Sequence, residues 1–188
     1  MIRTLTKKNT NTHIAALEYV LAKAQRPVQW LVIAHNDARL VRSVSSALKG
    51  QSAAVLEVSQ DTWDFEDKEF VEAIEWAMQQ EDIRQLVLVG SSQAGGAASR
   101  ASLVSDGVDV QGKVGYERLL ANVKQKSIRS AEAQEEFAGQ VQQLSQLPIL
   151  HDKVSNQELE LYGLLYRPET GLFSHYDADK DTFQVLGA

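Results

Sequence analysis

Residues 28–34 read VQWLVIA and residues 85–89 read QLVLV, two nearly continuous apolar runs of strand length. Strands that are apolar on both faces are typical of a parallel sheet covered by helices on both sides. A third short apolar segment, residues 53–58 (AAVLEV), lies between them. Helical periodicity separates these runs over residues 37–48 and 65–80. The alternation predicts βαβ units with right-handed crossovers, so the expected fold class is α/β with a mostly parallel central sheet.

Further elements are expected on either side of this core. Residues 12–25, 116–126 and 131–144 have the apolar spacing of helices. Residues 159–166 (LELYGLLY) predict another strand, which an Arg-Pro-Glu-Thr-Gly turn joins to residues 172–176. The chain is therefore expected to end in a β-hairpin or strand pair.

Composition limits the classes of function. The chain has 188 residues and 44% hydrophobic residues, which predicts a single domain over residues 1–188. Within it, the helical spacing near the N-terminus predicts a helical arm at about residues 1–26. The net charge of -6 argues against a nucleic-acid partner. No apolar run approaches the ~20 residues that span a bilayer, so no membrane partner is expected. The missing secretory signal leaves a cytoplasmic location as the expectation.

The chain has no cysteine. Disulfides, thiolate metal ligands and a cysteine nucleophile are therefore excluded together. Any metal site would need histidine or carboxylate ligands instead.

Residues 35–39, HNDAR, follow the first predicted strand, where open α/β sheets place their ligand crevices. Asp37 and Arg39 are candidates for a charge-assisted pair in which Arg39 orients the carboxylate. The alternative is that Asp37 caps the next helix and that Arg39 is a solvated residue of its first turn. Sequence spacing favours this second interpretation.

Residues 90–96, GSSQAGG, follow the third predicted strand and are interpreted as a loop of small residues. Backbone amides of such a loop can bind an anion, as they do at helix starts. The loop matches neither of the two common glycine-rich nucleotide motifs, so a nucleotide ligand is disfavoured. A tight turn that needs small residues for packing explains it equally well.

Two other features have structural interpretations. Residues 177–181, DADKD, begin like a calcium loop but lack its glycine and its closing glutamate, so we interpret them as a polar turn. The four histidines, His13, His35, His151 and His175, lie in separate segments. Their spacing does not indicate a zinc site.

Taken together, these segments resemble a β-class carbonic anhydrase over nearly the whole chain. Residues 21–40 (LAKAQRPVQWLVIAHNDARL) resemble the family's entry helix, first strand and Cys-x-Asp-x-Arg motif. Residues 71–96 (VEAIEWAMQQEDIRQLVLVGSSQAGG) resemble its next helix, strand and Gly-His-x-x-Cys-Gly motif. Residues 122–125 and 159–176 resemble its Asn-Val helix and its terminal strands. The resemblance implies the fold of that family.

The departures from the family fall on its metal. The family holds zinc through the cysteine of the first motif and through the histidine and cysteine of the second. The matching positions here are His35, Ser91 and Ala94. Because zinc chemistry needs about three protein ligands and an open position, the resemblance implies a member without zinc. Asp37 and Arg39 remain as the family's Asp-Arg dyad, without the zinc-bound water on which it acts.

The expected function is therefore that of a carbonic anhydrase-like pseudoenzyme, a noncatalytic binding or scaffold protein for which a small anion is one ligand class. The resemblance also implies a homodimer or a higher homo-oligomer. Two apolar faces are candidates for its interface, with ordinary intrachain core as the alternative: Ile14, Leu17 and Leu21, and Leu159, Leu161 and Leu164. The anion-binding candidates are Arg39, Ser91, Ser92, Gln93, Gly95 and Gly96.

An enzyme with altered chemistry is the alternative. In that hypothesis His35 is a general base next to Asp37, or one ligand of a different metal site, and Ser91 or Gln93 positions the substrate. Residual carbon dioxide hydration by Asp37 and Arg39 alone is the least favoured, because nothing else in the sequence generates a nucleophilic hydroxide.

Overall fold

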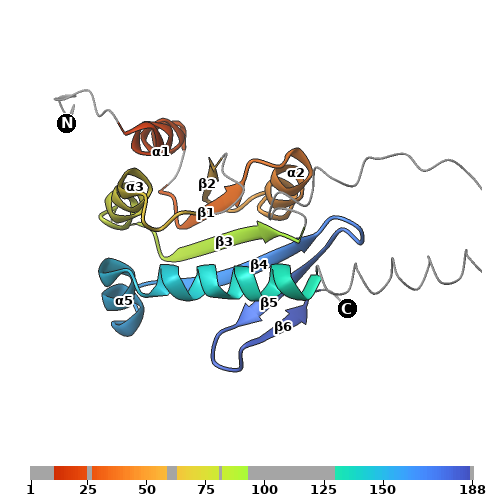
Figure 1. The fold of residues 1–188 in the computed structure, drawn as a ribbon. Helices are drawn as coiled ribbons and strands as arrows, with labels where there is room; N and C mark the ends of the chain where they lie inside the picture. The colour runs from red at the N-terminus through yellow and green to blue at the C-terminus, as the bar shows by residue number, and fades with distance from the viewer. Residues whose placement is uncertain (1–10, 25–26, 59–62, 81, 93–129, 187–188) are drawn as a thin grey trace, which may run out of the picture.

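A six-stranded mixed sheet organises the chain, with the strand order β2-β1-β3-β4-β5-β6 (Figure 1). The computed structural model describes residues 11–24, 27–58, 63–80, 82–92 and 130–186. The strands are β1 (Trp30–His35), β2 (Ala53–Val58), β3 (Gln85–Ser91), β4 (Glu160–Arg167), β5 (Leu172–Asp177) and β6 (Thr182–Val185). The pairs β1–β2, β1–β3 and β3–β4 are parallel, and the pairs β4–β5 and β5–β6 are antiparallel. This arrangement confirms the predicted α/β class and the C-terminal strand pair.

Helices cover this sheet. The described helices are α1 (Thr12–Lys23), α2 (Ala38–Ala47), α3 (Lys68–Met78), α5 (Pro148–Ser155) and a helix over residues 130–145, called here the 130–145 helix. Figure 1 shows the 130–145 helix running across the sheet and leading into α5. No helix in the described part of the chain is long and apolar enough to cross a membrane.

The two faces of the sheet are covered unequally. On one face, α1, α3, α5 and the 130–145 helix bury a large core that includes Leu17, Ile74, Phe137 and Leu150. On the other face, Leu40 and Val44 of α2 pack on a smaller cluster from the central strands. Burial on both faces explains why the central strands are continuous apolar runs.

A glycine notch receives the 130–145 helix. A Cβ atom on Gly90 of β3 would lie 2.6 Å from the ring of Phe137. A Cβ atom on Gly163 of β4 would lie 2.7 Å from a methyl group of Val141 and 3.3 Å from the same ring. Two neighbouring strands therefore leave out side chains where the helix comes closest to the sheet.

The structure corrects several predictions. Gly90 and Ser91, expected in the 90–96 loop, belong to β3, because they continue its parallel ladder against Leu165 and Tyr166 of β4. Sequence reasoning missed α5, which begins at Pro148, and the short strand β6. The expected helix over residues 116–126 lies outside the described residues.

The first apolar face proposed for an interface is largely core. Ile14 and Leu17 of α1 are buried within their own chain, and Leu159 is buried as well. The intrachain alternative is therefore correct for these three side chains.

Candidate functional site

The carboxyl ends of the central parallel strands bring His35 of β1 and Ser91 of β3 to the same edge of the sheet. Both side chains are buried, with 5% of His35 and 4% of Ser91 exposed. This edge is where open α/β sheets bind ligands, and it is where the sequence placed the candidate site.

His35 is covered by an indole. The imidazole and the ring of Trp63 stack with their centroids 4.0 Å apart and their planes 8° from parallel. Trp63 lies between β2 and α3, and only 4% of it is exposed. Its other ring contact is with Phe137 of the 130–145 helix, at 6.0 Å. Stacked and tilted aromatic pairs at such distances are favourable. A packed aromatic group therefore covers this face of His35.

Asp37 is the N-cap of α2. One carboxylate oxygen, Oδ1, accepts hydrogen bonds from the backbone N–H groups of Arg39 at 2.7 Å and of Leu40 at 3.0 Å. The Arg39 side chain is exposed, and no ion pair joins it to Asp37 in the part of the chain that the structure describes. This geometry is the helix-capping alternative raised above.

The proposed anion loop is described only at its start. Ser91 ends β3, and the backbone N–H of Ser92 donates to the carbonyl of Tyr166 at 2.9 Å. That amide extends the sheet and is already used. Gln93, Ala94, Gly95 and Gly96 lie outside the described residues.

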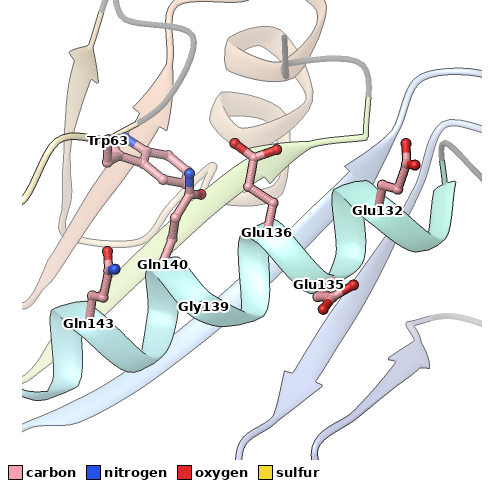
Figure 2. A pocket seen from close by; sticks show the side chains of 7 residues that line it. All are labelled: Trp63, Glu132, Glu135, Glu136, Gly139, Gln140 and Gln143. Carbon is pink, nitrogen blue, oxygen red and sulfur yellow. The ribbon is translucent and has the colours of Figure 1, made fainter.

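Two open hollows flank Trp63. The first has a volume of about 500 Å³ and runs along the 130–145 helix; Figure 2 shows Trp63 beside Gln140, with Glu132 and Glu136 further along that helix. The second has a volume of about 460 Å³ and shares Trp63 and Gln143 with the first. It is lined by Trp63, Asp64, Phe65, Glu66, Gln143, Gln146 and Leu147.

No metal-ligand group is found at this edge among the residues that the structure describes. Among the described residues, no three histidine, aspartate or glutamate side chains come close enough together to hold a metal. The other histidines are dispersed: His13 lies against Phe70, and His175 against Tyr162. His151 is an exposed side chain of α5.

Residues 177–181 form the polar turn that the sequence predicts. Lys180 Nζ lies 2.7 Å from Asp177 Oδ2, and Asp181 Oδ1 accepts a hydrogen bond from the Tyr176 hydroxyl at 2.8 Å. The Lys180 ammonium lowers the pKa of Asp177 and is itself held charged, with a raised pKa. Burial, followed by the bond to Asp181, raises the pKa of Tyr176. These contacts hold the β5–β6 hairpin together.

Sequence reasoning did not single out Trp63. Its only signal was an aromatic residue in a polar segment after the second strand, DTWDFED over residues 61–67. Exposed tryptophans are uncommon, so such a residue calls for a partner surface. Its contact with His35 depends on tertiary packing, which local pattern does not encode.

The family model described as carbonic anhydrase matches residues 30–173. That span includes His35, Asp37, Arg39, Trp63 and Ser91. No curated protein matches the chain in sequence.

Several solved structures of β-class carbonic anhydrases have the same fold. The β-carbonic anhydrase CcaA is 17% identical, with a TM-score of 0.57, and the match covers 91% of this chain and 89% of that chain. CafA of the fungus Aspergillus fumigatus is 18% identical, with a TM-score of 0.57, and the match covers 81% of this chain and 77% of that chain. A β-carbonic anhydrase of Sordaria macrospora, described as tetrameric, is 18% identical, with a TM-score of 0.54. That match covers 87% of this chain and 82% of that chain. Likeness at such identities establishes the fold alone.

Proposed function

This chain belongs to the β-carbonic anhydrase family, and we propose that it is a noncatalytic, homo-oligomeric member that binds neither zinc nor carbon dioxide as a substrate. In this proposal the family's fold serves as a binding or scaffold domain. The proposal concerns the edge of the sheet where β1 and β3 end, because the family's chemistry depends on side chains there.

The observation that carries the proposal is the environment of His35. The resemblance puts His35, Ser91 and Ala94 at the family's three zinc positions, and alanine has no donor atom. A neutral serine hydroxyl is a weak ligand for zinc, whose protein ligands are thiolate, imidazole and carboxylate. The remaining imidazole is stacked on Trp63 at 4.0 Å. A single histidine covered by an indole supplies neither the three protein ligands nor the open coordination position that zinc needs to activate water.

Equilibrium dialysis against zinc tests this proposal on untagged protein. We expect no stoichiometric zinc at micromolar free metal, and no difference between the wild type and His35→Ala. One equivalent of zinc that disappears in His35→Ala would contradict the proposal, because His35 would then recruit ligands from elsewhere in the chain.

Homo-oligomerisation is the second part of the proposal. It is supported by the resemblance and by the description of the Sordaria macrospora relatives as tetrameric. The described sheet also has two edge strands, β2 and β6, and exposed edges favour pairing with another chain. Sedimentation velocity should give a dimer or a larger species at micromolar concentrations. A monomer throughout that range would contradict this part.

A small anion is the ligand class proposed for the exposed Arg39 guanidinium. The Ser92 amide is hydrogen-bonded within the sheet, so Arg39 and residues beyond Ser92 carry this part of the proposal. Isothermal titration with bicarbonate, phosphate and acetate should give heat that Arg39→Ala abolishes. No heat from any of the three anions would remove anion binding and leave the scaffold role.

A further inference from the structure

We propose that Trp63 is a built-in occupant of a ligand cavity above His35, and that this cavity accepts a planar aromatic ligand with a cationic tail when the indole is displaced. The inference rests on the proposed noncatalytic function, because it explains what replaces the family's chemistry at this edge. It concerns the space that lies against His35, between the two hollows.

The position of the indole is the first argument. Trp63 and Gln143 each line both hollows, and of the two it is Trp63 that stacks on His35. The indole therefore borders two open spaces of about 500 Å³ and about 460 Å³. In this proposal, displacement of the indole joins the two hollows and opens them toward the imidazole.

The shape of the space is the second argument. The indole lies flat on His35, with the ring planes 8° from parallel, and Phe137 contacts it at a tilt of 58°. A ligand in the same place has one aromatic face to stack on and one aromatic neighbour at an angle. Flat aromatic rings gain most from such a site.

The indole is also incompletely satisfied. Its Nε1 is buried and has no hydrogen-bond acceptor within the described part of the chain. A buried donor without an acceptor costs free energy, so the filled state carries a penalty that displacement of the ring removes. A core tryptophan selected only for stability normally finds a partner for this group.

The rim sets the charge of the ligand. Among the residues that the structure describes, five acidic side chains line the two hollows and no lysine or arginine does: Glu132, Glu135, Glu136, Asp64 and Glu66. No ion pair involves any of these five carboxylates in the residues that the structure covers. A cationic tail on an aromatic ring in the cavity is therefore attracted by these carboxylates, whereas an anionic tail is repelled.

Removal of the Trp63 indole tests the proposal. Trp63→Ala should bind tryptamine, measured by titration calorimetry and by a rise in Tm, while the wild type binds it weakly. Indole-3-acetate has the same ring and the opposite charge, and it should bind at least about fivefold more weakly, the size of an exposed ion-pair effect. Trp63→Ala that folds and binds neither compound would overturn the proposal.

Two variants serve as controls. Trp76→Ala removes the same ring from α3, where Trp76 packs partly buried on the core and lines neither hollow, so tryptamine should not raise its Tm. The double variant Trp63→Ala/His35→Leu has a side chain of similar size at position 35 but no aromatic ring on which a ligand can stack. It should therefore bind tryptamine more weakly than Trp63→Ala. Equal rescue of Trp76→Ala would show nonspecific stabilisation and would overturn the proposal.

Trp63→Leu repeats the test if Trp63→Ala does not fold, because it retains an aliphatic side chain between the hollows. The same preference for tryptamine is expected, and its absence in folded protein overturns the proposal. Failure of the proposed function is separate: stoichiometric zinc bound by the wild type would contradict that function, whatever Trp63→Leu or Trp63→Ala binds.

Discussion

The carboxylate of Asp37 accepts hydrogen bonds from the backbone at the start of α2. Its Oδ1 accepts from two N–H groups at the start of α2, and such a cap satisfies donors that the helix itself leaves without partners. The Arg39 side chain is exposed and lies outside this arrangement. An aspartate, the residue type that the family uses beside its metal, serves here as the N-cap of α2.

A capping role gives a prediction for stability. Asp37→Ala should lower the free energy of unfolding by about 1 kcal/mol, measured by urea denaturation, because the first-turn N–H groups lose their acceptor. Asp37→Asn should retain most of that stability, and Arg39→Ala should change it by less than about 0.5 kcal/mol. If Arg39→Ala is as destabilising as Asp37→Ala, the two side chains act as a pair.

Gly90 carries a second prediction, which concerns close packing. Gly90→Ala should cost about 1–3 kcal/mol of stability, because the new methyl group meets the Phe137 ring at 2.6 Å and the ring has to shift. Urea denaturation measures the loss.

Gly139→Ala is the matched control for this prediction. It lies on the 130–145 helix with nothing within 4 Å of its Cβ position, so it should stabilise the protein by about 0.5–1 kcal/mol. A tolerated Gly90→Ala would show that the 130–145 helix does not dock as closely as the structure has it.

At the residue scale, the sequence predicted where His35 and Asp37 lie in the fold better than it predicted their contacts. Strand ends placed both residues at the carboxyl edge of the sheet, and the capping interpretation of Asp37 was already available from its spacing. The stack on Trp63 was not predictable, because it joins two segments that only the packing of α3 and the 130–145 helix brings together.

An ion pair contributes to the stability of the β5–β6 hairpin. Asp177 and Lys180 lie at opposite ends of its turn, and the Tyr176 hydroxyl links the same turn to the 130–145 helix by accepting from Gln142 at 2.9 Å. Local charge and one tyrosine therefore connect this edge of the sheet to the helix above it.

The stability that the Asp177–Lys180 pair contributes should depend on pH. Lys180 lowers the pKa of Asp177 below its usual 3.8, so the contribution is fully present above that value and is lost as the pH falls through the folded-state pKa. The bond to Asp177 raises the pKa of Lys180 above its usual 10.5, so the contribution is fully present below 10.5 and is lost as the pH rises through the raised folded-state pKa.

Lys180→Ala measures this contribution. Its difference in Tm from the wild type should be largest near neutral pH and should vanish in strong acid. A difference that persists unchanged in strong acid would mean that the lysine acts through packing of its aliphatic chain.

At the element scale, periodicity predicted the parallel core and the 130–145 helix, because long apolar patterns report burial directly. It missed α5 and β6, which have 8 and 4 residues. Elements this short carry too few periodic positions to stand out, and tertiary contacts decide them. The end of β3 was also placed too early, since Gly90 and Ser91 read as loop residues.

For the whole molecule, the fold is established and the loss of the family's chemistry is proposed. The sheet order and the family match over residues 30–173 establish a β-carbonic anhydrase fold. In the proposed function, the family's donors at this edge are replaced, and an imidazole covered by an indole lies there instead. A fold can keep its core while its site changes, because the core depends on apolar burial and the site on a few particular side chains.

Stopped-flow hydration of carbon dioxide by untagged protein, dialysed against zinc beforehand, tests the central claim most directly. The account predicts a rate that cannot be distinguished from buffer and that is the same for the wild type and His35→Ala. A hydration rate above buffer that depends on zinc and is lost in His35→Ala would contradict it, and would identify this chain as a working member of its family.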